Sequence, residues 1–178
     1  MSEYILNTSE LVEKAEMLKA GDRVILSGTV FTSRDAAHKR IVQLISDGGE
    51  LPFDLKGACI YYAGPTPAPK GLPIGSCGPT TSGRMDPFAP LLLDNGLAAM
   101  IGKGGRNKAV CDAIIRNKAV YLCAVGGAGA LAAKCVVKCE EIAFFDLGCE
   151  SVKRIEIKDF PLVVGIDCHG GSMFAKAD

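Results

Sequence analysis

The sequence has no tryptophan, and phenylalanine and tyrosine together make up only 6% of its 178 residues. Proteins that bind single-stranded nucleic acid stack bases on aromatic rings, so this class has little support. An excess of either charge is also absent, because 20 lysines and arginines balance 20 aspartates and glutamates. General affinity for phosphate backbones or acidic membrane surfaces requires a basic excess, so both kinds of partner are disfavoured.

The sequence also has no membrane-length apolar run, and we expect no secretory leader. Its longest uncharged stretch, residues 119–133, contains three glycines and is too short for a membrane helix. The first residues, MSEYILN, have no basic segment that leads into an apolar run, as a secretory signal would. The eight cysteines fall well below the roughly 8–10% of residues typical of disulfide scaffolds. We therefore predict a soluble protein of the reducing cytoplasm.

Apolar residues make up 48% of the chain, enough for one folded domain over residues 1–178. Hydrophobic periodicity predicts strands that alternate with helices, which is typical of an α/β domain with a mixed sheet and flanking helices. The predicted strands cover residues 23–30, 58–62, 97–101, 119–125, 136–145, 152–157 and 162–167. The predicted helices begin near Thr8 or Ser9, near Ser33 or Asp35, at Asn107 and at Gly129.

Residues 64–90 form a long segment rich in glycine and proline, and eight of the nine prolines lie between Pro52 and Pro90. Irregular segments of this length inside a compact domain are usually functional or disordered. Because its centre, residues 76–86, is rich in hydroxyl groups, we expect a functional loop.

The first candidate site motif is TSRDAAHKR, residues 32–40, at a predicted strand-to-helix junction. Free backbone amides at a helix start bind anions, and the planar fork of Arg34 matches a carboxylate or phosphate. His38 is a candidate for proton transfer. The alternative is a solvated charged face with an ordinary histidine.

The second motif is GPTTSGRMD, residues 78–86. Three hydroxyls, at Thr80, Thr81 and Ser82, precede a glycine and Arg84, which suits a donor-rich turn around an oxyanion. The alternative is an irregular loop whose hydroxyls bind its own backbone.

The third motif is GKGGRN, residues 102–107, between a strand and a helix. Its glycines allow close backbone approach, and the helix start favours a negatively charged ligand near Lys103. It lacks the spacing of a P-loop and of a dinucleotide fingerprint, so a nucleotide site is poorly supported. A purely structural turn remains the alternative.

The cysteines form no Cys-x-x-Cys pair, and neither His38 nor His169 has a familiar zinc spacing to them. We interpret them as buried, unligated thiols, and an independent zinc or iron–sulfur site that uses Cys135, Cys139, Cys149 and Cys168 is the rival hypothesis. The three anion-adapted turns fit one small substrate with more than one carboxylate. No complete catalytic set is visible, so we expect a partner chain to supply the rest.

These motifs occur together, in order, over nearly the whole chain, with YAGP (residues 62–65) and GIDCHG (residues 165–170) between and after them. In this combination the sequence resembles the β-type catalytic domain of iron–sulfur hydro-lyases, the class I fumarases and L-tartrate dehydratases. The resemblance implies a swivelling β/β/α domain. It also implies an α subunit that carries a [4Fe–4S] cluster on three cysteines, none of which corresponds to a cysteine of this chain.

By the same resemblance, Arg34, Arg84 and Lys103 hold the substrate carboxylates, with Thr81 beside them, and Thr80 or His38 lies at the proton-transfer position. The implied reaction is the reversible hydration of fumarate to (S)-malate. The run TTSGRMD, residues 80–86, resembles fumarases more than tartrate dehydratases, which remain the alternative. The chain ends soon after Phe174, so we expect a separate β subunit. The resemblance implies a heterodimer or an α2β2 assembly. A non-catalytic dicarboxylate-binding module is the rival from another class.

Overall fold

The computed structural model describes residues 1–174, and seven strands in this part form one mixed sheet. Five strands close into a ring, because β7 pairs with both β5 and β2 in the order β2-β3-β4-β5-β7. Strand β1 pairs with β2 and strand β6 with β7, outside the ring. The strands are β1 (Glu3–Asn7), β2 (Arg23–Thr32), β3 (Cys59–Tyr61), β4 (Ala99–Gly102), β5 (Val120–Cys123), β6 (Val136–Ala143) and β7 (Val152–Ile166).

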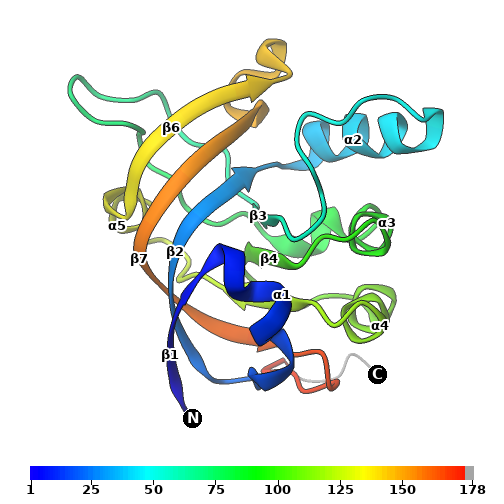
Figure 1. The fold of residues 1–178 in the computed structure, drawn as a ribbon. Coiled ribbons are helices and arrows are strands. Elements are labelled where there is room, and N and C mark those ends of the chain that lie inside the picture. Colours follow the sequence, from blue (N-terminus) through cyan, green and yellow to red (C-terminus); the bar gives the residue numbers. More distant parts are fainter. Residues whose placement is uncertain (175–178) are drawn as a thin grey trace.

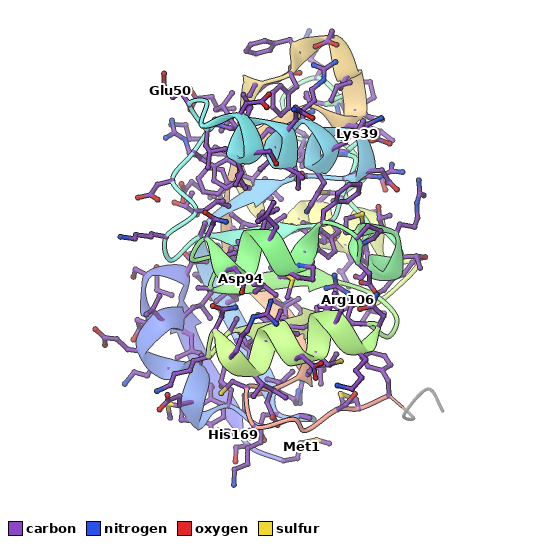
Figure 2. All side chains as sticks on the ribbon, turned by 90° about the vertical axis from the view of Figure 1, so that its right-hand side faces the viewer. Met1, Lys39, Glu50, Asp94, Arg106 and His169 are labelled. Carbon is purple, nitrogen blue, oxygen red and sulfur yellow. The ribbon has the colours of Figure 1, made fainter. Side chains whose placement is uncertain are left out.

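Three helices cover one side of the ring and lie one above another, α2 (Asp35–Asp47), α3 (Ala89–Asp94) and α4 (Lys108–Arg116) (Figures 1 and 2). The remaining helices are α1 (Leu11–Lys14) and α5 (Gly129–Lys134), with 3-10 turns at Thr8–Glu10, Ala15–Met17, Ser82–Met85 and Phe145–Glu150. The longest helix, α2, has 13 residues. Within residues 1–174, no helix is long and apolar enough to cross a membrane.

The buried side chains form two hydrophobic clusters, one inside the ring and one outside it. They are separate because successive side chains of a strand point to opposite faces of the sheet. In β3, Cys59 and Tyr61 point into the ring, where they pack with residues such as Leu26 and Val164. Ile60 points outward and packs with side chains of α2, α3 and α4. Side chains thus fill the interior of the ring, so a ligand site has to lie outside this interior.

The structure confirms the α/β class and the mixed sheet with flanking helices, and it corrects several boundaries. The helix predicted over residues 129–134 is confirmed. The helix predicted from Asn107 begins one residue later, because Asn107 is its cap and accepts the Val110 amide. The strands predicted over residues 152–157 and 162–167 are one strand, β7, which continues through Asp159. The sequence analysis missed β1, α3 and the 3-10 turn at residues 82–85. Residues 175–178 of the predicted single domain lie outside the described part.

Candidate functional site

The three predicted motifs follow β2, β3 and β4, and these strands are parallel neighbours. Their carboxyl ends therefore meet at one edge of the sheet, the usual place for a ligand site in such sheets. Figure 2 shows Lys39, early in α2, and Arg106, just before α4, toward the same side of the molecule. The topology alone thus brings segments from residues 34 to 107 to one edge.

Arg34 lies at the start of α2, where its side chain is mostly buried. Its Nη2 atom is 3.3 Å from Oε1 of Glu150, and its Nε atom is 4.0 Å from Oδ2 of Asp35. The guanidinium packs against Gly64, where an added Cβ would lie only 2.8 Å from Nη1. Nε of Arg34 and Oδ2 of Asp35 are buried without a hydrogen-bond partner among the described residues. Polar atoms in this condition are suited to a ligand or water.

The second and third motifs are joined backbone to backbone. Thr81 and Lys103 form a parallel bridge, in which the Ser82 amide donates to the Lys103 carbonyl at 2.9 Å. The Lys103 amide in turn donates to Oγ of Ser82 at 3.1 Å. The Thr80 amide donates to the Tyr62 carbonyl at 2.6 Å. The backbone of this turn is therefore fixed to the ends of β3 and β4.

The side chains of these motifs remain available for a ligand. Thr80 is half-buried and Thr81 exposed, and within residues 1–174 their hydroxyls have no hydrogen-bond partner. The half-buried Lys103 side chain lies over Gly126, where an added Cβ would be 3.4 Å from Cδ of Lys103. It forms no ion pair with any residue that the structure describes.

Arg84 connects the second motif to the first, because its Nε atom is 2.9 Å from Oδ1 of Asp35. The Asp35 carboxylate therefore faces both Arg84 and Arg34. The structure brings together Arg34, Thr80, Thr81, Arg84 and Lys103 at one edge. The three cations there favour an anionic ligand, because Asp35 and Glu150 neutralise only part of their charge.

His38 differs from these residues because its imidazole is fully buried. Nδ1 lies 2.7 Å from Oγ of Ser33 and 3.0 Å from the Arg34 carbonyl, and Nε2 has no partner in the described part of the chain. The ring packs edge-on against Tyr62. Burial lowers the pKa of His38 to about 4, so the side chain is neutral near pH 7. The role of His38 in proton transfer stays a prediction. Its contact with the Arg34 carbonyl helps to hold the backbone at the start of α2.

Sequence reasoning missed Arg106 and Asp86. The Arg106 side chain is fully buried, and its Nε atom is 2.6 Å from Oδ1 of Asp86. Asp86 also accepts the Asn107 amide at 2.7 Å. Both residues belong to motifs that the sequence analysis singled out, but their pairing across 20 positions leaves no periodic signal.

The cysteines do not form a metal site in the part of the chain that is described. Cys59, Cys77 and Cys168 are buried, and burial raises the pKa of each thiol. Across residues 1–174, no group of three or more His, Cys, Asp or Glu side chains is placed to hold a metal ion. These residues therefore do not fit an iron–sulfur cluster.

The sequence matches the family described as Fumarase C-terminus over residues 2–177. The chain belongs to this family. It is 41% identical over 160 residues to fumarate hydratase 2 of Leishmania major, an alignment that covers 88% of this chain and 28% of that protein. It is 39% identical over 169 residues to the anaerobic class I fumarate hydratase of Escherichia coli K12, with 94% and 31% covered.

A shorter relative of this fumarase C-terminus chain is the putative L(+)-tartrate dehydratase subunit beta of Methanocaldococcus jannaschii. The two are 37% identical over 183 residues, which cover 99% of this chain and 93% of the relative. The chain thus spans less than a third of the fumarate hydratases and nearly all of a protein named as a β subunit.

Proposed function

We propose that this chain is the β subunit of an iron–sulfur hydro-lyase that reversibly hydrates fumarate to (S)-malate. The observation that carries the proposal is the arrangement of Arg34, Arg84 and Lys103 at one sheet edge. Membership of the fumarase C-terminus family and the identity to fumarate hydratases support the substrate and the reaction class.

The cationic side chains have two tasks in this proposal. They bind the two carboxylates of the substrate, and each charge-assisted contact contributes about 1.5–3 kcal/mol. They also lower the barrier of proton removal, because a carbon acid beside a carboxylate gains further negative charge when it loses its proton. Preorganised cations stabilise that charge without having to move.

Thr80 is the group we assign to the proton-transfer position. Its amide donates to the Tyr62 carbonyl, and the next residue, Thr81, forms the bridge to Lys103, so the half-buried Thr80 stands beside the Lys103 turn. A threonine hydroxyl is a weak base, so nearby positive charge must stabilise its deprotonated form. Thr81, its exposed neighbour, is assigned to the substrate carboxylate.

The chain acts with an α subunit that holds a [4Fe–4S] cluster, and the pair works in the cytoplasm as a heterodimer or an α2β2 assembly. The names of the relatives called subunit beta support a second subunit. This division is tested by anaerobic reconstitution of the chain alone and of the co-purified complex with iron and sulfide. Iron bound stoichiometrically by this chain alone would contradict it.

The function is tested by the purified complex in an anaerobic assay of fumarate absorbance. We expect turnover with the complex and none with either chain alone. Turnover by this chain alone would contradict the shared site. A folded complex that binds fumarate without turning it over would instead indicate a non-catalytic dicarboxylate-binding module.

L(+)-Tartrate dehydration is the second candidate, favoured by the match over nearly the full length of two proteins named tartrate dehydratase subunit beta. The two substrates are compared in the same complex through kcat/KM. We expect fumarate to be preferred, and a higher kcat/KM for L(+)-tartrate would reverse the assignment.

A further inference from the structure

Arg106 is a buried cation that packs against residues of the candidate site on the side of the core. Its side chain has no exposed surface, and the side chain of Asp86 is 7% exposed. The guanidinium carbon lies 5.2 Å from the ring centre of Tyr62 and 5.1 Å from that of Tyr121, so it is held between two aromatic rings. In Figure 2 Arg106 lies at the turn that leads into α4.

A buried ion pair of this kind is weak evidence for a role in stability. Removing two charges from water is costly, and well-packed apolar side chains in their place are often equally stable. The partners of Arg106 instead all lie next to the turns of the candidate site. Asp86 ends the second motif, and Tyr62, whose hydroxyl is 3.4 Å from Nη2, carries the carbonyl that accepts the Thr80 amide.

Tyr121 links the same two turns through its hydroxyl. Its Oη atom is 2.8 Å from Oγ of Ser82 and 2.8 Å from the Gly104 carbonyl. The carbonyl can only accept, so Tyr121 donates to Gly104 and accepts from Ser82, whose oxygen receives the Lys103 amide. Burial raises the pKa of Tyr121, which keeps this donor protonated. An unbroken chain of hydrogen bonds thus runs from Lys103 to Gly104.

We propose that Arg106, Asp86, Tyr121 and Ser82 form a brace that sets the position of Lys103 relative to Thr81 and Arg84. These are positioning residues, because they contact the backbone of the turns that carry Thr81, Arg84 and Lys103 and do not contact the substrate. The brace fixes the spacing of the cations that bind the two carboxylates. This inference rests on the proposed function for its kinetic consequence.

The kinetic test uses Tyr121→Phe and Arg106→Lys in the purified complex. Tyr121→Phe keeps the ring and removes one hydroxyl, and Arg106→Lys keeps the charge and loses the planar fork. We expect each variant to raise KM for fumarate about tenfold, the effect of one lost charge-assisted contact, with a smaller change in kcat per active site. A general loss of folded protein would lower activity without changing KM.

Two comparisons separate positioning from structure. Arg116→Lys is the matched control, since Arg116 pairs with Asp94 at the other end of α4, and it should leave KM unchanged. In a Lys103→Met background, Tyr121→Phe should raise KM no further, because the group that it positions is gone. An unchanged KM in both brace variants, or full additivity with Lys103→Met, would overturn the proposal.

Amide hydrogen exchange on the full chain tests the brace without any measurement of enzyme activity. Tyr121→Phe and Arg106→Lys should speed exchange at the Lys103 and Asn107 amides, which donate to Ser82 and Asp86. The Ser82 amide, which donates to the Lys103 carbonyl, should exchange faster as well. Arg116→Lys should not. If the wild-type complex has no hydro-lyase activity, the proposed function fails. The exchange data then still decide whether the brace holds the turns, and unchanged protection in both variants overturns it.

Discussion

Nε of Arg84 lies 2.9 Å from Oδ1 of Asp35, although the two residues are 49 positions apart in the chain. The pair joins the turn after β3 to the start of α2, where Arg34 also faces Asp35. A carboxylate thus already lies between the two arginines that the proposal assigns to the substrate, and a substrate carboxylate would occupy the same kind of environment.

Replacing Arg84 by alanine tests this assignment. We expect kcat/KM for fumarate to fall roughly ten- to a hundredfold, which corresponds to the loss of one charge-assisted contact of about 1.5–3 kcal/mol. Steady-state kinetics of the complex provide the measurement. Arg154→Ala is the control, because Arg154 also forms a half-exposed ion pair, with Glu140 between β7 and β6. Equal effects of the two substitutions would remove Arg84 from the site.

Replacing Lys103 by methionine removes a cation and keeps most of the side-chain volume. Since Lys103 has no ion-pair partner among residues 1–174, its charge is free to bind a ligand. We expect a higher KM and a weaker dependence of kcat/KM on salt concentration, because one attractive charge is lost. Lys108→Met, at an exposed position of α4, should change neither quantity. The same salt dependence in Lys103→Met and wild type would argue against the role.

The buried His38 predicts a pH dependence of stability. Its pKa is about 4 in the folded chain and about 6.5 when exposed, so the unfolded chain binds the proton first as pH falls. The stabilising contribution of the neutral ring is complete above pH 6.5 and is lost toward pH 4, by roughly 3 kcal/mol. Urea unfolding at a series of pH values should show a shallower decline for His38→Gln than for wild type.

The exposed histidine offers the control, and His169→Gln should retain the wild-type decline. If His38→Gln and wild type lose stability in parallel between pH 6.5 and 4, the imidazole is not buried in its neutral form.

Gly28 lies at an irregularity in the pairing of β2 with β7 and has a φ of +115°. A Cβ atom there would clash with Oγ1 of Thr8, so Gly28→Ala adds a steric clash to backbone strain. Gly21, with a φ of +94° and no atom near an added Cβ, provides the matched control. Urea unfolding should show a loss of about 1–2 kcal/mol for Gly21→Ala and clearly more for Gly28→Ala. Equal losses would exclude the clash.

Helices were predictable from the sequence where a capping residue or a glycine marks their ends. Asn107 caps α4, and a glycine in the left-handed region, Gly48, ends α2. Strand β1 escaped detection because its apolar residues Tyr4, Ile5 and Leu6 are consecutive. The sequence therefore does not alternate, although burial does, since Ile5 is exposed on the edge strand. β7 was divided in two because the polar residues near Asp159 resemble a turn, whereas β2 pairs along most of its length.

The candidate site was predictable in part for the same reason. Arg34, Arg84 and Lys103 stand in turns rich in glycine or hydroxyl groups, and such turns are visible in a sequence. The pairing of Arg106 with Asp86 depends on how β4 and the loop after β3 meet in space, and no local pattern encodes it. The burial of His38 also depends on tertiary packing, because His38 lies in α2 and Tyr62, against which it packs, follows β3.

The five-strand ring has a consequence for self-association. Among the described strands, each member of the ring is paired on both sides, so free backbone groups for strand addition remain only at the outer edges of β1 and β6. Charged side chains line the second of these edges, at Lys138, Glu140 and Glu141. Such charges discourage another chain from extending the sheet beyond β6.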